Sequence, residues 1–231
     1  MNFPPFLQFV KPVWLAALFA ACLSPASAGE TSSWQAEDAK SVGSAMIVPD
    51  RKGGYDFEIA DATGISIGEK PKGGKDAKSL VFSGDQVLAF RTIRAIVAPY
   101  NGFKVKARVN VSELSADTDT TLFRHGTSWE IRYLVNRSAF LFIVWHEADV
   151  TTEVLVPARP GNWHELVAEY KPEKMTLAVD GEKAEGVPKG PMFEGPKPQS
   201  LFLGASAPRP VEGALSRAFR GGVADMEIDW E

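Results

Sequence analysis

The sequence has only one cysteine among its 231 residues, and it lacks the residue patterns that mark several kinds of catalytic site. Cys22 lies in an apolar stretch near the N-terminus, so the rest of the chain cannot form a disulfide or use a thiol in catalysis. The three histidines, His125, His146 and His164, are not spaced as HxH or HExxH, which are typical of zinc sites.

Neither sign of charge dominates, because 25 basic residues face 29 acidic ones and the formal net charge is −4. The basic residues are also scattered along the chain. Lys104, Lys106 and Arg108 alternate with apolar residues, which is typical of the wet side of a strand and not of a phosphate-binding patch. With 45% hydrophobic residues, the composition predicts a folded globular protein that does not bind nucleic acid.

The N-terminal segment is predicted to be a secretory signal peptide. An apolar run over residues 13–23 follows Lys11, and the small residues Ala-Ser-Ala at 26–28 come shortly after it. This pattern predicts a leader over residues 1–28 that is cleaved after Ala28. The run is too short to span a bilayer as a stable helix, so we expect no transmembrane span in the mature chain. The expected location is the periplasm, the cell envelope or the extracellular space.

A lipid anchor on Cys22 is the alternative interpretation of the same segment. LFAAC (residues 18–22) loosely resembles the motif at which lipoproteins are processed. Phe19 occupies the position three before the cysteine and fits that motif poorly. Cleavage of the leader is therefore favoured over lipidation.

Short apolar runs with the period of a β-strand fill the rest of the chain. FKVKARVNV (residues 103–111) alternates strictly between apolar and polar residues, which predicts one face in the core and one in water. Similar runs occur at 79–82, 86–91, 120–124, 129–134, 139–146, 152–157, 164–170, 174–180, 200–204 and 223–230. No stretch has helical periodicity, so the chain is predicted to be all-β, an antiparallel sandwich of two sheets.

The organisation is predicted to be a single domain over residues 29–231. Residues 61–78 and 186–199 are rich in Gly, Pro and Lys, and both are predicted to be surface loops because apolar strands continue on either side. Asp180-Gly181 is expected to supply the positive φ of a tight reversal. A core position is expected for Trp163, with a ligand contact as the alternative.

A family resemblance is carried by GNWHELVAEYKPEKMTLAVDGEKAEG (residues 161–186), which has a Trp-His pair, two apolar strands around a tight turn, and Asp-Gly. This segment resembles the hairpin of laminin-G-like domains, which are concanavalin A-like jelly rolls. Supporting similarity lies in residues 73–90, 118–135, 201–210 and 219–230. The resemblance implies a jelly-roll sandwich over the whole mature chain. Such folds include lectins, adhesion modules, β-glucanases and polysaccharide lyases, so the resemblance does not fix a function.

The last five residues, EIDWE, raise the hypothesis of a glycan-active hydrolase. The β-glucanases of this fold carry a Glu-x-Asp-x-Glu strand. By resemblance, Glu227 would be the nucleophile, Glu231 the general acid and Asp229 the residue that tunes them. Alternate residues of a strand share one face, so the three acids would lie together. A retaining pair of carboxyls needs a separation of roughly 5–5.5 Å, which side-chain lean and strand twist would have to provide.

The alternative interpretation of EIDWE is purely structural, and it is favoured. In the laminin-G-like pattern this segment is the closing strand, whereas further strands follow the motif in the glucanases. Val223, Met226, Ile228 and Trp230 would then pack inward around an irregularity at 224–225, and the acids would face solvent. This interpretation predicts a buried Trp230.

A binding surface is predicted around AFLFIVW (residues 139–145), which is apolar on both faces. One face would pack in the core, and the other would be covered by a ligand, a partner or a loop. Trp145 on this strand, with Trp129, Arg132 and Tyr133 on the preceding one, are the candidate ligand-binding residues, because aromatic rings with an arginine suit sugar stacking. Cover by a loop is the alternative.

Calcium is the one cofactor considered, because laminin-G-like and lectin sandwiches often bind it at loop edges. Asp85, Asp117 and Asp119 could supply oxygen ligands. They are also ordinary turn residues, so the site is a weak prediction.

Together these observations predict an exported, non-catalytic binding module. The expected partner is a polysaccharide or another glycan, or a protein of the cell envelope or extracellular space. The alternatives are the hydrolase that uses Glu227, Asp229 and Glu231, and a structural envelope protein without a small ligand.

Overall fold

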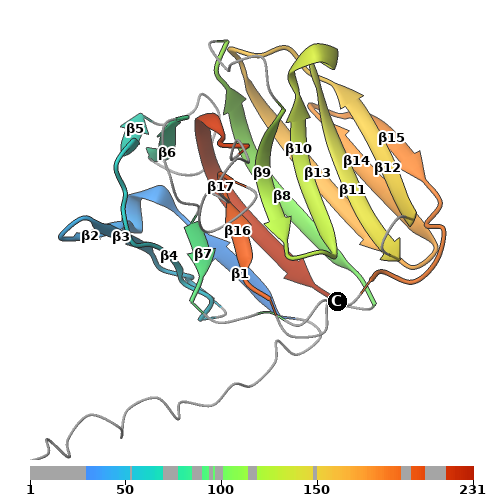
Figure 1. The fold of residues 1–231 in the computed structure, drawn as a ribbon, viewed down its shortest axis with the longest axis horizontal. Coiled ribbons are helices and arrows are strands. Elements are labelled where there is room, and N and C mark those ends of the chain that lie inside the picture. Colours follow the sequence, from blue (N-terminus) through green and yellow to red (C-terminus); the bar gives the residue numbers. More distant parts are fainter. Residues whose placement is uncertain are drawn as a thin grey trace, which may run out of the picture.

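The protein is described by a computed structural model that covers residues 30–52, 54–69, 78–84, 90–93, 96, 101–113, 119–147, 150–193, 199–205 and 217–231. The predicted leader and Cys22 lie outside these residues. The chain forms two antiparallel sheets that pack face to face (Figure 1). This arrangement confirms the predicted all-β jelly-roll sandwich. The helices of the described part are single short turns, and none of them is long and apolar enough to cross a bilayer.

Sheet A contains most of the long strands. Its order across the sheet is β15 (Glu182–Gly186), β14 (Lys174–Val179), β13 (Trp163–Lys171), β8 (Phe103–Val111), β17 (Arg220–Trp230), β6 (Lys78–Ser83) and β5 (Ile65–Glu69). A further strand, β1 (Thr31–Trp34), pairs with the second half of β17, whereas β6 pairs with its first half. The last strand in sequence order therefore lies inside the sheet and not at its edge.

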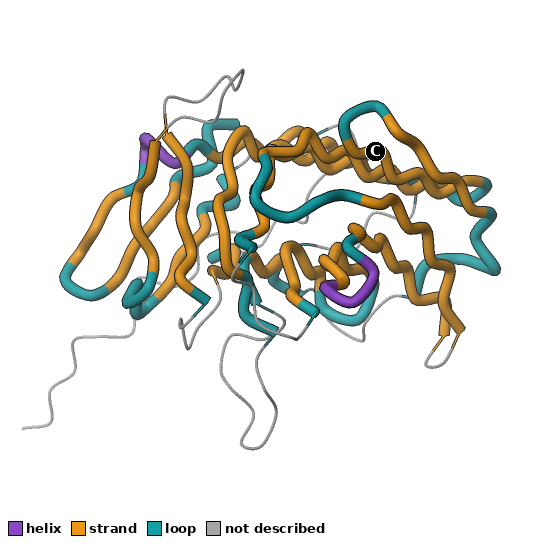
Figure 2. The backbone as a smooth tube through the Cα atoms, turned by 90° about the horizontal axis from the view of Figure 1, so that it is seen from above, coloured by secondary structure: helices purple, strands orange, loops and turns teal. Residues whose placement is uncertain are grey.

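Sheet B covers the other side of the core. Its order is β12 (Val150–Pro157), β11 (Ala139–Glu147), β10 (Trp129–Leu134), β9 (Thr120–His125), β16 (Leu201–Leu203), β7 (Phe90–Thr92), β4 (Phe57–Ile59), β3 (Ala45–Val48) and β2 (Lys40–Val42). Two 3₁₀ turns interrupt the strands, η1 (Ala36–Asp38) after β1 and η2 (Val135–Arg137) between β10 and β11. Figure 2 shows the two layers from above, with loops joining them at this end.

The alternation in the sequence explains which side chains enter the core. Every second residue of β8, from Phe103 to Val111, is buried, and the residues between them are partly exposed. The same period of two governs β13, whose even-numbered residues are buried. Alternation along a strand places successive side chains on opposite faces, so each sheet presents one apolar face to the core.

β17 follows the predicted closing-strand pattern. Its pairing with β8 shifts between Ala224 and Glu227, and Asp225 has a φ of 51°, so the predicted irregularity at 224–225 is confirmed as a β-bulge. Inward-facing side chains on both sides of the bulge are buried, with exposed fractions of 0–3% for Val223, Met226, Ile228 and Trp230. The predicted burial of Trp230 is therefore confirmed.

The main difference from the sequence prediction is in the first half of the chain. Residues 61–78 were predicted to be a loop, but β5 runs from Ile65 to Glu69 and pairs with β6. The strands β1 to β4 were not predicted either. Each of them has only three or four residues, too few to establish a period, and β5 has no buried residue and lies in a stretch rich in Gly and Lys.

Aromatic side chains at the C-terminal end of the sandwich connect the two sheets. Phe103 of β8 stacks on Trp129 of β10 with ring centroids 4.6 Å apart. It also lies 5.8 Å from the ring of Tyr170 on β13 and 6.4 Å from that of Trp230 on β17. All four residues are buried. Phe103 thus contacts both neighbouring strands of its own sheet and the opposite sheet.

Replacing Phe103 tests this central position. We expect Phe103→Ala to lower the free energy of unfolding by about 3–5 kcal/mol, because a large core side chain leaves a cavity between the sheets. Lys104→Ala removes the adjacent, partly exposed side chain and should cost less than about 1 kcal/mol. Urea unfolding followed by tryptophan fluorescence measures both changes. Similar values for the two variants would contradict this account of the core.

Candidate ligand-binding cleft

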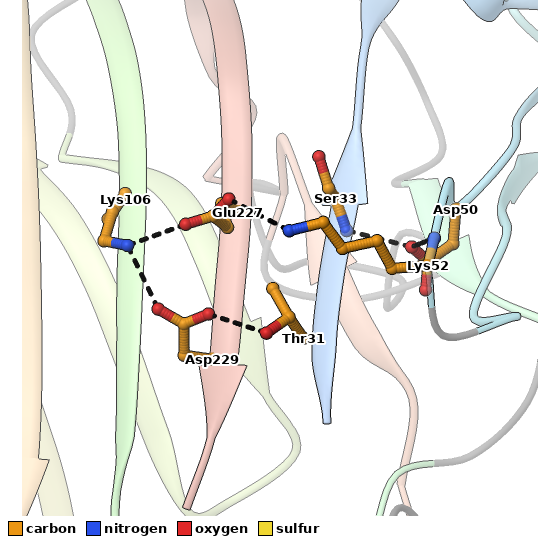
Figure 3. Close-up of polar contacts among 7 residues, drawn as sticks. All are labelled: Thr31, Ser33, Asp50, Lys52, Lys106, Glu227 and Asp229. Carbon is orange, nitrogen blue, oxygen red and sulfur yellow. Dashed lines mark hydrogen bonds and ion pairs between the residues drawn. The ribbon is translucent and has the colours of Figure 1, made fainter. Parts of the chain in front are cut away.

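The acids of β17 lie on the outer face of sheet A, where lysines from neighbouring segments pair with them (Figure 3). The Lys106 ammonium donates to Glu227 at 2.6 Å and to Asp229 at 3.0 Å. The Lys52 ammonium lies 3.6 Å from the second oxygen of Glu227. The Thr31 hydroxyl donates to the second oxygen of Asp229 at 3.0 Å. Both carboxylates therefore have partners on each side.

Lys52 reaches β17 because a turn after β3 is fixed by Asp50. One carboxylate oxygen of Asp50 accepts the backbone N–H of Ser33 at 2.9 Å and that of Lys52 at 3.0 Å. Figure 3 shows this contact beside the Lys52 side chain, which extends from the turn towards Glu227. The cation beside β17 thus comes from a separate, structured segment.

The ion pairs shift the pKa values of the groups that form them. Burial would raise the pKa of Asp229, but the hydrogen bonds from Lys106 and Thr31 outweigh burial and lower it. The hydrogen bond to Glu227, helped by Asp229, raises the pKa of Lys106 against the opposing effect of burial. Both groups are therefore held in their charged forms at neutral pH.

The third acid of the motif belongs to a different ion pair. Glu231 lies 3.2 Å from the Lys171 ammonium of β13, whereas Glu227 pairs with Lys106 and Lys52. Glu227 also borders a depression on the outer face, together with Arg108 and other residues. Cross-strand ion pairs account for the acidic pattern, because the acids lie opposite the basic residues that alternate along β8 and opposite Lys171 at the end of β13.

A pH series tests the role of Asp229. Its lowered pKa means that it stabilises the fold above the pKa of the unfolded chain, near 3.9, and that this contribution is lost as the pH falls through the folded pKa. We expect Asp229→Asn to lower the free energy of unfolding at pH 7 by about 0.5–1 kcal/mol. Urea unfolding at pH 7 and at pH 2.5 should show the difference from wild type shrinking on acidification. Glu153→Gln, on sheet B, serves as the control, and a gap that widens in acid would refute the assignment.

The predicted aromatic binding surface does not form as expected. Trp129 and Tyr133 were predicted to lie on it with Arg132 and Trp145, but both are buried in the core, so this part of the prediction is wrong. The Tyr133 hydroxyl donates to the carbonyl of Ala158 at 2.9 Å. Odd-numbered residues of β10 face the core, so Arg132 is the only one of the three candidate residues on that strand that shares the outer face with Trp145.

Arg132 is committed to a buried carboxylate. Its Nη2 donates to Glu130 at 2.7 Å, and its Nε lies 2.6 Å from the other oxygen of Glu130. Glu130 is fully buried and also accepts the Thr121 hydroxyl at 2.6 Å. Arg124 lies 3.7 Å from Glu130, and its guanidinium is 5.8 Å from the centre of the Trp145 ring. These arginines offer a ligand few free donors, because their charge is matched internally.

The two-faced apolar character of β11 is confirmed. Phe140 and Phe142 pack in the core, whereas Leu141 and Ile143 form a small separate cluster on the outer face. That cluster also contains Leu134, and the half-buried Trp145 and Leu155 pack against it. Leu141 and Ile143 are themselves buried, so this face presents little free apolar surface.

The structure describes one of the three aspartates that were considered as calcium ligands. Asp85 and Asp117 lie outside the described residues, whereas Asp119 lies just before β9. Among the described residues, no three His, Cys, Asp or Glu side chains gather closely enough to hold a metal ion. Calcium binding therefore stays a prediction.

The three histidines lie near strand ends, and all are buried. His125 donates its Nε2–H to the carbonyl of Ile96 at 3.1 Å, and burial lowers its pKa to about 4. His146 contacts the Thr152 hydroxyl at 2.8 Å. His164 differs from these two, because it lines an open cleft.

This cleft has a volume of about 640 Å³. It lies at the end of β8 opposite the C-terminus, because Trp163 pairs with Asn110 whereas Trp230 pairs with Phe103. It forms where the η2 turn, the β12–β13 loop and the β14–β15 turn meet. Its lining residues are Arg137, Ser138, Pro157, Ala158, Arg159, Asn162, Trp163, His164, Val179, Asp180 and Glu182. The cleft therefore combines a buried apolar floor, from Ala158 and Val179, with charged and amide side chains at its rim.

Tight turns build two walls of the cleft. Ser138 adopts a left-handed conformation with φ 46° directly after η2. Asp180 and Gly181 have φ values of 51° and 86°, which confirms the predicted positive φ at this reversal. Such conformations favour Gly, Asn and Asp, so the Asp-Gly pair in the sequence fixes the position of this wall.

His164 ties two of these loops together. Its Nδ1 lies 2.6 Å from the Asp180 carboxylate, and its Nε2 lies 2.7 Å from the carbonyl of Arg159. Both partners are acceptors, so a ring that is protonated on both nitrogens satisfies both contacts. The second oxygen of Asp180 accepts the backbone N–H of Glu165 at 2.8 Å. Burial would raise the pKa of Asp180, but these hydrogen bonds lower it.

Trp163, beside His164, faces the other way along the strand. Its ring packs over Gly222 of β17, where an added Cβ would come within 2.6 Å of the ring. The predicted core position is only partly correct, because the ring is half-buried on the outer face of sheet A. Glycine is needed at 222 for this close approach.

Three polar side chains at the rim of the cleft are uncommitted, which means that they have no polar partner among the described residues. Arg137, Arg159 and Asn162 are exposed, and their side chains make no hydrogen bond or ion pair within the residues that the structure describes. Glu182, on the opposite side, is likewise exposed. Sequence reasoning missed these residues because they come from three separate turns, and only their neighbours in the 161–186 segment carried a signal.

The comparison with known proteins agrees with this fold. A sequence model described as the concanavalin A-like lectin/glucanases superfamily matches residues 82–228. The chain belongs to this superfamily. No curated protein sequence matches the chain.

Several solved structures share the fold of this superfamily member. The binding domain of Paraclostridial Mosquitocidal Protein 1 has a TM-score of 0.63 and 12% identity, over 88% of this chain and 49% of that one. The binding domain of botulinum neurotoxin DC in complex with SialylT has a TM-score of 0.53 and 11% identity, over 88% and 48%. The same domain with rat synaptotagmin II has a TM-score of 0.55 and 12% identity, over 88% and 48%. The chain spans about half the length of these proteins, and identities this low show the fold alone.

The hydrogen bond between His164 and Asp180, called the latch here, can be tested by two substitutions at one position. Asp180→Asn keeps a residue that tolerates positive φ and removes the charge, so we expect a loss of about 1 kcal/mol in unfolding free energy, screened because Asp180 is half-exposed. Asp180→Ala should cost about 1 kcal/mol more, because alanine is strained in the left-handed region. Urea unfolding compares the two with Glu182→Ala, an exposed neighbour expected to change little. Equal stability of all three variants would contradict the latch.

Proposed function

We propose that the protein is an exported, non-catalytic binding module that recognises a glycan in the cleft between η2, the β12–β13 loop and the β14–β15 turn. The observation that carries this proposal is the set of uncommitted donors at the rim, Arg137, Arg159 and Asn162. Binding sites combine a concave apolar surface with a few polar groups that orient the ligand. Sugar rings present both apolar faces and hydroxyls, which suits such a surface.

The choice of this cleft over the predicted aromatic surface rests on which groups are free. Arg132 and Arg124 pair with the buried Glu130, so their donors are already used. Arg137 and Arg159 make no such contact in the described residues. A donor that must leave an internal partner binds a ligand less favourably than one that exchanges only water.

Proteins of the same fold support a binding role without defining the partner. Several structural neighbours are binding domains of toxins, and one of them was solved both with SialylT and with rat synaptotagmin II. Glycans and proteins are thus both known partners in that domain. Another neighbour is a sialidase from Trypanosoma rangeli, so the fold also occurs in an enzyme. The charged and amide side chains at the rim, around an apolar floor, favour a glycan for this chain. A protein of the envelope or extracellular space is the alternative.

Export is part of the proposal and rests on the leader pattern of residues 1–28. The hydrolase alternative is disfavoured because Glu227 and Asp229 share the Lys106 ammonium and Glu231 pairs with Lys171. A structural envelope protein without a ligand is the remaining alternative, and the uncommitted rim of the cleft argues against it.

A glycan array probed with the purified protein tests the proposal, followed by titration of the best glycan. We expect Asn162→Ala to weaken that binding about fivefold to tenfold, because one hydrogen bond to a sugar hydroxyl contributes about 1 kcal/mol. Asn101→Ala, an exposed asparagine at the opposite end of the sandwich, should leave the affinity unchanged.

Two results would overturn the proposal. Binding of no glycan on the array would favour a protein partner or a structural role. Release of reducing sugar from a β-glucan that disappears in Glu227→Gln would establish the hydrolase instead. Glu227→Gln should otherwise bind glycans as the wild type does, because Glu227 lies outside the cleft.

A further inference from the structure

We propose that the glycan recognised by the cleft carries an acidic group, a carboxylate or a sulfate, which Arg137 and Arg159 bind. This inference rests on the proposed function, since it specifies the ligand of the same cleft. Arg137 and Arg159 differ from several other arginines of this protein, which form ion pairs with carboxylates.

Several other arginines with exposed or half-exposed side chains have carboxylate partners. Arg51 lies 3.0 Å from Glu37, and Arg91 lies 2.9 Å from Glu58. On the outer face of sheet B, Arg124 and Arg132 share Glu130. Arg137 and Arg159 have no such partner in the described residues, although both line one cleft. Two guanidinium groups without carboxylate partners in one concave site create a positive potential that attracts an anionic group.

The acids of the cleft do not form ion pairs with these two arginines in the described residues. Asp180 is matched by the His164 ring at 2.6 Å and by the backbone N–H of Glu165 at 2.8 Å. The pKa of Asp180 is lowered, because these hydrogen bonds outweigh the effect of burial. Both oxygens of Asp180 therefore already accept hydrogen bonds within the wall of the cleft. His164 thus acts as a positioning residue that keeps Asp180 from pairing with the arginines.

Glu182 gives the cleft a polarity that suits a sugar acid. It is exposed at the start of β15, and no ion pair of its side chain occurs in the described residues. The cleft thus has a donor region at Arg137, Arg159 and Asn162 and an acceptor at Glu182. A guanidinium fork matches the two oxygens of a carboxylate or sulfate, whereas a carboxylate accepts hydroxyl groups. An acidic sugar with free hydroxyls presents both kinds of group on one ring.

Ionic hydrogen bonds of this kind are about twice as strong as neutral ones, so they should dominate the selectivity of a solvent-open cleft. We expect an acidic glycan to bind about tenfold more tightly than its neutral analogue. This preference should weaken at high salt, because exposed charges are screened.

Calorimetric titration of the purified protein with matched oligosaccharides tests the inference. The probes are trigalacturonate, its fully methyl-esterified form and a sulfated galactose trisaccharide, each at 50 and 500 mM NaCl. We expect Arg137→Gln and Arg159→Gln each to reduce the preference for the acidic forms about tenfold. They should weaken the binding of the neutral ester much less than that of the acidic forms. Arg137→Lys, which keeps the charge but loses the fork, should retain part of the preference.

Lys40→Gln is the matched control. Lys40 is exposed on β2, at the edge of sheet B farthest from β12, and its loss changes the net charge by the same amount. The preference should be unchanged in this variant. Glu182→Gln should keep or strengthen the binding of acidic glycans, because it removes a negative charge from the rim.

The outcomes separate this inference from the proposed function. Stronger binding of either the carboxylated or the sulfated probe, lost in the arginine variants, supports the inference and tells the two acidic groups apart. Equal affinity for acidic and neutral probes overturns it and leaves the proposed glycan binding intact. A preference that survives in both arginine variants also overturns it. Failure to bind any glycan on the array overturns the proposed function and the inference with it.

Discussion

The pairing of β8 with strands on both of its edges is the interaction on which the rest of the structure depends. β13 and β17 flank this strand along nearly its whole length, and its inward side chains fill the centre of the core. Its outward side chains are mostly basic, so the acids of the neighbouring strands fit opposite them. One alternating strand thus sets both the packing of the sandwich and the charge pattern of its outer surface. The acidic residues of β17 lie opposite the basic residues of β8. This pairing explains the acidic sequence pattern of β17 without a catalytic role.

Much of this arrangement could be predicted from the sequence where the strands are long. The alternation of residues 103–111 and the inward position of Trp230 are both found in the structure. The short strands of the first half could not be predicted, because three or four residues carry no measurable period. The paired stretch at Ile65–Glu69 owes its structure to pairing with β6 and not to its own sequence.

The candidate site shows a sharper limit of sequence reasoning. Placing Trp129 and Tyr133 beside Arg132 overlooked the alternation of β10, in which charged residues at 130 and 132 separate the apolar ones. The burial of Glu130, which makes it the internal partner of Arg132, could not be predicted from the strand alone, because a charged residue is expected to face solvent. The cleft brings together three turns that are separated by tens of residues, so only the fold defines it. Within it, Asp180-Gly181 was recognisable, because the conformation that it requires is written in two adjacent residues.

The internal position of β17 also constrains the order of assembly. Residues 78–83 and 103–111 lie on the two sides of this strand, and they do not pair with each other. Until residues 220–230 are available, these two early segments have no bridging strand, and sheet A remains in two unjoined parts. Folding therefore waits for contacts between residues more than a hundred positions apart, and such long-range closure is slow compared with hairpin formation. During that interval the unpaired edges of these two segments are exposed and can pair with other chains.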